Sequence, residues 1–168
     1  ALVEPATAAT TGKTGGEVLN SDLVFQLSGE NGSETFNFGD GTAASQIADA
    51  VNLVADSTGV SASFSAATGL TFQSTGYGSN TLVDIEVISE SAGGTFATNL
   101  SADRANGADI IATINGVEAD GQGNTLSINT SVLDLTLTVD AGSTTNFAFQ
   151  ITGGGALFQL GPDVTTNQ

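Results

Sequence analysis

Alternating polar side chains in the segment EADGQGN are the first candidates for chemistry in this sequence. Asp120, Gln122 and Asn124 follow the spacing with which ligands alternate in a calcium-binding loop. An EF-hand loop that began at Asp120 would need a glycine at its sixth position and a bidentate glutamate at its twelfth. Thr125 and Ser131 occupy those positions. The segment therefore favours a hairpin loop over a metal site, and we expect the protein to hold no metal and no cofactor.

Paired carboxylates are the second candidate, because glycoside hydrolysis needs two acids at a fixed separation around a sugar cleft. Asp84 and Glu86 alternate with apolar residues, so they project from the same face of one strand. Nothing near them in the sequence indicates a pocket or a tryptophan on which a sugar could stack. We interpret this pair as a solvated strand face.

Nucleophilic and phosphate-binding motifs are incomplete. The sequence contains many serines but no histidine or cysteine, so the usual activation of a nucleophile is missing. Lys13 lies in TTGKTGGE, which matches a phosphate-binding loop over four residues. The first glycine of that loop is missing, and we expect neither a strand before the segment nor a helix after it. The sequence therefore predicts no catalytic residue and a protein that is not an enzyme.

The charge balance excludes two classes of partner. Of 168 residues, 18 are acidic and only Lys13 and Arg104 are basic, which gives a formal net charge of −16. Binding to nucleic acid requires clustered lysine and arginine, and the same acidity opposes contact with anionic membranes. We expect Arg104 to form a salt bridge with Asp103, Asp109 or Glu90 rather than to bind an anionic partner.

The sequence also predicts no membrane-spanning or export segment. No run approaches the about 18 apolar residues that a membrane helix needs. Ala1 opens the chain without the basic and apolar regions of a signal peptide. We therefore expect no association with a membrane.

Hydrophobic periodicity predicts antiparallel β-structure with one helix. Alternating residues predict a hairpin formed by strands near 23–27 and 35–38. The period then changes to that of a helix over 43–56, with Thr42 as its N-cap and Gly59 as its C-terminal stop. The apolar face of this helix consists of Ala44, Ile47, Ala48, Val51, Val54 and Ala55. Further strands are expected at 60–65, 70–72, 83–87, 110–114, 126–128, 133–139 and 147–151.

Composition divides the chain into four parts. We expect residues 1–21 to form an extended lead-in outside the core and residues 22–92 to form a module with the helix. A Gly- and Ser-rich connection follows at 93–107, and residues 108–168 form an antiparallel β module with an exit segment. A helix that covers one face of an antiparallel sheet is an α+β arrangement. The predicted fold is therefore α+β, mainly antiparallel β with one short helix packed on a sheet, in two small β-rich modules.

Three asparagines begin Asn-X-Ser sequences, namely Asn31, Asn99 and Asn129. Such sequences are acceptors for N-linked glycans in hosts that have the required enzymes. They are possible glycosylation sites.

Three stretches resemble segments of bacterial flagellins and related hook-associated proteins, and they occur in the order of that family. The stretch ATINGVEADGQGNTLSINTSVLDLTLTV, centred on Ile114, Asn115, Gly116 and Val117, resembles a flagellin hook IN-type motif. The stretch from IADAVNLVADSTGV to TLVDIEVIS resembles a flagellin segment with a short helix, two strands and a Tyr-Gly turn. The closing GGGALFQLGPDVTTNQ resembles the approach to a flagellin's C-terminal helix.

The resemblance implies a structural protein without catalysis. It would be the outer, surface-exposed region of a flagellin in the extracellular bacterial flagellum, with neighbouring flagellin subunits as partners. The sequence lacks the long terminal helices with which flagellins polymerise, so we expect the isolated chain to be a monomer. A secreted adhesin-like or carbohydrate-binding β module is the alternative. The resemblance leaves open whether the subunit belongs to the filament or to a hook-associated protein.

Overall fold

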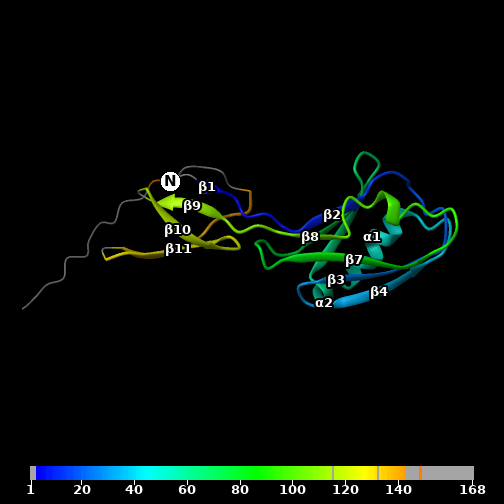
Figure 1. Ribbon diagram of the computed structural model, residues 1–168, viewed down its shortest axis with the longest axis horizontal. Coiled ribbons are helices and arrows are strands. Elements are labelled where there is room, and N and C mark those ends of the chain that lie inside the picture. The colour runs from blue at the N-terminus through cyan, green and yellow to red at the C-terminus, as the bar shows by residue number, and fades with distance from the viewer. Residues whose placement is uncertain (1–2, 115, 132, 143–147, 149–168) are drawn as a thin grey trace, which may run out of the picture.

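The computed structural model describes residues 3–114, 116–131, 133–142 and 148. Its strands form three antiparallel sheets, and its buried apolar side chains form two separate hydrophobic clusters. Figure 1 shows two β-rich parts arranged along the long axis of the molecule. The mostly antiparallel strands and the helices packed on them confirm the predicted α+β class.

We call these two regions the helical part and the sheet part. The helical part contains a four-stranded sheet, a three-stranded sheet and both α-helices, and the sheet part contains a single five-stranded sheet. Two chain segments connect them, one after β1 (Val3–Glu4) and one after β8 (Arg104–Asn106), as Figure 1 shows.

The four-stranded sheet has the order β4-β3-β7-β8. A tight hairpin joins β3 to β4, as predicted, and Phe25 pairs with Phe36 across it. The pairing of β3 with β7 shifts register between Val24 and Phe25, which leaves Ile88 unpaired and 56% exposed. The strands are β3 (Leu23–Gly29), β4 (Ser33–Phe38), β7 (Leu82–Glu90) and β8 (Arg104–Asn106).

The three-stranded sheet has the order β2-β6-β5, and α1 (Ala44–Leu53) packs against β5 and β6. The buried face of α1 consists of Ala44, Ile47, Ala48 and Val51, four of the six residues that the helical periodicity predicted. The other two, Val54 and Ala55, lie beyond the end of α1 and are half-buried. The strands are β2 (Thr10–Lys13), β5 (Val60–Ser65) and β6 (Gly69–Ser74).

The predicted helix over 43–56 is observed as two helices, and its N-cap residue differs from the predicted one. Ala43, not Thr42, is the N-cap residue, and its backbone N–H donates to Gln46 Oε1 at 3.1 Å. The Thr42 hydroxyl instead donates to the Gly39 carbonyl at 2.7 Å. A short second helix, α2 (Ala55–Thr58), continues after a break at Val54. Gly59 ends it with a φ of 76°, because glycine adopts this left-handed conformation without steric cost.

Phe25 lies at the centre of the hydrophobic cluster of the helical part. Its ring stacks on those of Phe36 and Phe96 with centroid distances of 5.3 Å each, and it meets Phe72 edge-on at 6.2 Å. Phe25 and Phe72 come from different sheets, so this contact joins the four-stranded sheet to the three-stranded sheet. The helical part is therefore a layered core with α1 on its three-stranded side.

The five-stranded sheet of the sheet part has the order β1-β9-β10-β11-β12. Paired residues alternate between an apolar face, where Leu126 lies opposite Leu137, and a polar face, where Ser127 lies opposite Thr136. We call the latter its polar face. The strands that follow β1 are β9 (Ile111–Ile114), β10 (Val117–Gln122), β11 (Thr125–Asn129) and β12 (Asp134–Thr138).

The expectation that residues 1–21 lie outside the core is wrong. Residues 3–4 and 10–13 are strands of two different sheets, Ala9 and Leu19 belong to the cluster of the helical part, and Ala6 belongs to that of the sheet part. The side chains here are small because the backbones approach closely: a Cβ on Gly12 would lie 2.9 Å from the Leu70 carbonyl oxygen. Between Val3 and Val18 the sequence has no large apolar residue that would reveal β2.

Two further strands were not predicted. β10 was expected to be loop, but only Ala119 and Gly121 face inward there, so its alternation is too weak to indicate a strand. β8 is a three-residue strand within the expected connection at 93–107, which also contains the 3-10 helix η1 (Ala97–Asn99). The expected strand at 147–151 and the exit segment lie outside the described residues.

Candidate functional site

The segment EADGQGN does not form the expected loop. Asp120 and Gln122 lie on β10, with Asp120 opposite Ser127 and Gln122 opposite Thr125. Gly123 and Asn124 alone form the turn into β11, and Gly123 has a φ of 55°. Among the described residues, no group of three or more acidic side chains is placed to hold a metal ion. The prediction that no metal binds here stays a prediction.

The residues singled out as a family motif lie at the hairpin between β9 and β10. Ile114 ends β9 and pairs with Val117, the first residue of β10. Gly116 lies between them with a φ of 82°, a conformation that favours glycine, and Asn115 lies outside the described residues. Ile114 is buried in the cluster of the sheet part, whereas Val117 is 48% exposed. Their role as a family motif stays a prediction.

The three sequons lie in different surroundings. Asn31 is exposed, but its side-chain amide donates to the Asp56 carbonyl at 3.2 Å. Asn99 ends η1 and is half-buried, and its carbonyl accepts the Thr14 N–H at 3.1 Å. Asn129 is exposed at the end of β11. Glycosylation of these residues stays a prediction.

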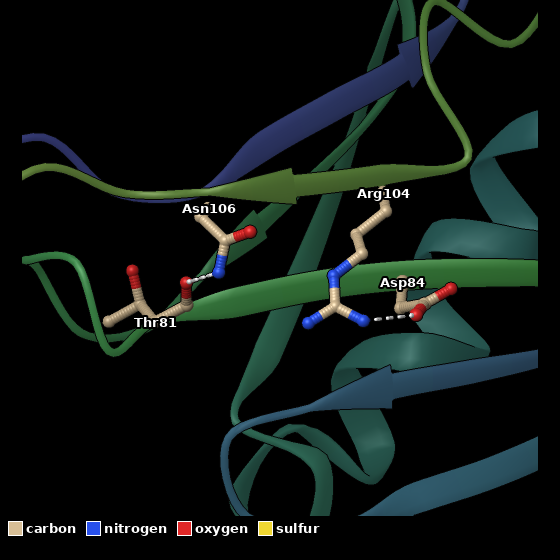
Figure 2. A network of polar contacts seen from close by, with 4 residues as sticks. All are labelled: Thr81, Asp84, Arg104 and Asn106. Atoms are coloured by element: carbon tan, nitrogen blue, oxygen red, sulfur yellow. Dashed lines mark hydrogen bonds and ion pairs between the residues drawn. The ribbon is translucent and has the colours of Figure 1, made fainter.

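Arg104 forms its ion pair with a residue that was not expected. Its Nη1 lies 3.5 Å from Asp84 Oδ2, across the β7–β8 pair, as Figure 2 shows. Asn106, two residues further along β8, donates to the Thr81 carbonyl at 3.2 Å (Figure 2). The expected partners were Asp103, Asp109 and Glu90. The antiparallel register decides the pairing, because Arg104 lies directly opposite Asp84.

Lys13 is a buried lysine of β2, only 4% exposed. Its Nζ donates to the Gly15 carbonyl at 2.6 Å. Burial lowers the pKa of Lys13, and the charge of Glu90 partly opposes that shift. Glu90 accepts the backbone N–H groups of Phe96 at 2.6 Å and Ala97 at 3.2 Å. Lys13 therefore helps to fix the core of the helical part and does not face solvent as a ligand-binding group.

The Asp109 carboxylate connects the two parts by accepting three hydrogen bonds. It follows β8 and precedes β9, within one of the two connecting segments. Its Oδ1 accepts the N–H of Ser79 at 3.0 Å and that of Gly123 at 2.8 Å, and its Oδ2 accepts the Ser79 hydroxyl at 2.5 Å. The hydrogen bonds from the Ser79 hydroxyl, the Gly123 N–H and the Ser79 N–H lower the pKa of Asp109.

A polar hollow of about 410 Å³ lies beside Asp109. It is bordered by the loop that carries Ser79 and by the polar face of the sheet part. Besides Ser79, Asp109 and Gly121, its lining consists of Asn80, Asp120, Gln122, Thr125, Ser127 and Thr136. A second hollow of about 440 Å³ shares Asp109 and Asp120 and extends over β9 and β10. The first hollow presents hydroxyl, amide and carboxylate groups, whereas the polar side chains of the second are all carboxylates. No cation lines either of them.

The sequence did not predict the contact of Asp109 with Ser79 and Gly123. Asp109 was considered only as a partner for Arg104, and its actual partners are 30 and 14 residues away in the sequence. The adjacent Ser79 lies in a turn-like segment, STGYGSN, that gives no sign of what it contacts. Only a glycine in each of the two segments could have hinted at a close approach between them.

A comparison with protein-family models matched residues 24–76 to the flagellin hook IN motif. The matched segment is about a third of the chain. The predicted resemblance to flagellin-type proteins is thereby confirmed. A comparison with curated proteins found no match to the chain.

The hook IN motif begins in β3 and ends just after β6. It includes α1, α2 and most of the aromatic cluster around Phe25. The match overlaps the second resembling stretch, which runs from 47 to 89, over residues 47–76. It does not include the hairpin at Ile114 and Val117. In this chain, β3, α1, β5 and β6 of the matched segment contribute buried residues to one hydrophobic cluster, and Phe36 and Phe38 of β4 pack against it.

No helix in the described part of the chain is long and apolar enough to cross a membrane.

Proposed function

We propose that this chain is the outer, surface-exposed region of a flagellar filament subunit and that it has no catalytic activity. The observation that carries the proposal is the hook IN motif at residues 24–76, which folds into the core of the helical part. The sheet part extends this core along the long axis of the molecule (Figure 1). An elongated, acidic β-structure suits a surface that meets the medium, because like charges keep such surfaces soluble and apart.

The division of the chain into two modules is part of the proposal. Two separate hydrophobic clusters support it, one for each β-rich part. The proposed modules are 22–92 and 108–168, joined by a connection at 93–107. The N-terminal strands extend both modules. β1 (Val3–Glu4) pairs with β9 and so belongs to the second module, and β2 (Thr10–Lys13) pairs with β6 and so belongs to the first.

The proposal that the chain is not an enzyme rests on the chemistry of its polar groups. Asp84, one of the two carboxylates considered for glycoside hydrolysis, is paired with Arg104 on a sheet surface. Lys13 is buried, and Asp109 is held by backbone and hydroxyl donors. These groups serve structural contacts. The neighbours in the filament are therefore proposed to be the partners of this chain, with no nucleic acid, membrane or cofactor.

Labelling of intact filaments tests the outer position. The chain contains no cysteine, so single cysteines introduced into it give unambiguous sites. Ser45→Cys lies on the exposed side of α1 and Ser127→Cys on the polar face of the sheet part, whereas Val51→Cys is the buried control. In filaments of the full-length protein, a bulky maleimide should label the first two positions and spare the third. An outer position is refuted if Ser45→Cys and Ser127→Cys react in the free chain but stay unlabelled in filaments.

The same charge that suits an outer surface predicts that the 168-residue chain is a monomer in isolation. Its net charge of −16 opposes self-association. Light scattering at physiological salt should give the mass of one chain. A stable oligomer at micromolar concentration would show that the chain itself carries an assembly surface.

The polar hollow beside Asp109 favours a second candidate, a carbohydrate-binding β module. Its amide and hydroxyl side chains are of the kind that hydrogen-bond sugars. No aromatic ring lines it, and the described phenylalanines belong to or pack against the cluster of the helical part, so the stacking surface that sugar-binding sites use is missing there. A glycan array with Asn80→Ala as control tests this candidate: binding that the substitution abolishes would favour it over the purely structural role.

A further inference from the structure

The two parts of the molecule meet at a joint built from three chain segments. One connecting segment contains Thr7 and the other contains Ala108, and they pair as antiparallel backbones, with the Thr7 N–H donating to the Ala108 carbonyl at 2.9 Å and the Ala108 N–H to the Thr7 carbonyl at 3.1 Å. The third segment is the loop after β6, where the Gly78 N–H also donates to the Thr7 carbonyl at 3.1 Å. The connection is therefore a hydrogen-bonded unit.

The loop after β6 belongs to the helical part but touches the sheet part. A Cβ added to Gly78 would lie 2.6 Å from Cα of Gly123, in the turn between β10 and β11, and 2.6 Å from Asp109 Oδ1. A Cβ added to Gly123 would lie 3.0 Å from the Tyr77 carbonyl oxygen. Only glycines permit this approach of two backbones, and Gly78 and Gly123 both have positive φ, at 109° and 55°.

Asp109 bonds to both surfaces of this contact. Through Ser79 it holds the loop of the helical part, and through the Gly123 N–H it holds the turn of the sheet part. The Gly123 carbonyl in turn accepts the Ile110 N–H at 3.0 Å, so the turn is tied to the connecting segment at both Asp109 and Ile110. Without the carboxylate, the N–H groups of Ser79 and Gly123 would lose the acceptor they share.

We propose that the Asp109 carboxylate is a latch that fixes the angle between the helical part and the sheet part, and that its protonation releases the latch. With the latch closed the chain tumbles as one elongated body. With the latch open the two parts reorient about the Thr7 and Ala108 segments while each keeps its own core. The proposal concerns the chain itself and does not depend on its position in a filament.

The charged groups around Asp109 are all acidic. Asp120 of β10 lines both hollows beside Asp109, and Glu118 lines the one over β9 and β10. Glu4 of β1 lies opposite Ile111, two residues after Asp109, and the loop after β6 contributes no charged side chain. Hydrogen-bond donors therefore hold the carboxylate, without help from a cation. Because these donors bind the ionised carboxylate, they lower the pKa of Asp109 from its ordinary value of 3.8. The latch is therefore closed at neutral pH and weakens as the pH falls below 3.8.

The matched pair Asp109→Asn and Asp120→Asn tests the latch. Both substitutions remove one negative charge beside the same hollow. Asp120, however, projects from the polar face of β10 and makes no side-chain hydrogen bond to the loop or the turn among the described residues. Residual dipolar couplings and amide relaxation, measured at neutral pH, report whether the two parts share one alignment and one tumbling time.

Wild type and Asp120→Asn should fit a single alignment tensor, and Asp109→Asn should need two. Gly78→Ala, which opens the joint from the other side, should also lose the common tensor while amide shifts within each core stay unchanged. In wild type the common tensor should be lost in acid, and Asp109→Asn should show no further change. A single tensor in Asp109→Asn and Gly78→Ala, or equal loss in Asp120→Asn, overturns the proposal.

Discussion

Asn52, near the end of α1, pairs with the backbone of Ala62 in β5 as though it were a strand residue. Its Nδ2 donates to the Ala62 carbonyl and its Oδ1 accepts the Ala62 N–H, both at 2.8 Å. β5 is an edge strand of the three-stranded sheet. The side chain of a helix therefore satisfies the edge that would otherwise be open to pairing with another chain.

Asn52→Ala should weaken the fold and expose this edge. The loss of two hydrogen bonds at a partly solvated site should lower the free energy of unfolding by about 1 kcal/mol. The substitution should also increase self-association at high concentration, because the Ala62 N–H and carbonyl become free. Urea denaturation and light scattering measure the two effects. Leu53→Ala is the control, since that neighbour is 87% exposed and its loss should be nearly neutral.

The buried face of α1 gives a second prediction. Val51 is fully buried between the helix and the sheet, so Val51→Asp should lower the free energy of unfolding by at least about 3 kcal/mol through an unpaired buried charge. Ser45→Asp, on the exposed side of the first turn, should be neutral or stabilising by about 0.5 kcal/mol, because α1 has no acidic residue near its positive end. Equal stability of the two variants would contradict the packing of α1.

The sequence predicted those elements whose core side chains are large and regularly spaced. The helical face of Ile47 and Val51 and the hairpin strands around Phe25 and Phe36 were found because an apolar period reports burial directly. β10 was missed because its inward side carries only Ala119 and a glycine. There the buried volume is supplied by strands on either side, and the periodic signal disappears.

The joint between the two parts could not be predicted for a different reason. It depends on the meeting of Asp109, Ser79 and Gly123, which are separated along the chain, and on two backbones that approach at glycines. A single sequence gives no information on which turns touch. The polar residues of STGYGSN and EADGQGN are equally compatible with solvent-exposed turns.

The buried lysine predicts a pH dependence at the alkaline side. Because burial lowers the pKa of Lys13 in the folded chain, the unfolded chain binds more protons between that lowered value and 10.5. The free energy of unfolding of the wild type should therefore rise, relative to that of Lys13→Met, as the pH increases from neutral towards 10.5. Urea denaturation of both proteins over this range measures the difference. A constant difference would show that the fold does not shift the pKa of Lys13, and a difference that falls with pH would show that the fold raises it. Either result would contradict the prediction.

Two glycines with the same backbone conformation separate the cost of conformation from that of contact. Gly41 and Gly69 have φ of 77° and 80°, but a methyl group on Gly41 would meet no atom within 4 Å, whereas one on Gly69 would collide with the carbonyl oxygen of Lys13. Gly41→Ala should lower the free energy of unfolding by about 1 kcal/mol through its left-handed backbone alone. Gly69→Ala should lower it by at least about 2 kcal/mol more, since β2 must move away from β6. If urea denaturation gave equal losses for the two variants, the close pairing of β2 with β6, and with it the place of the N-terminal segment in the core, would be wrong.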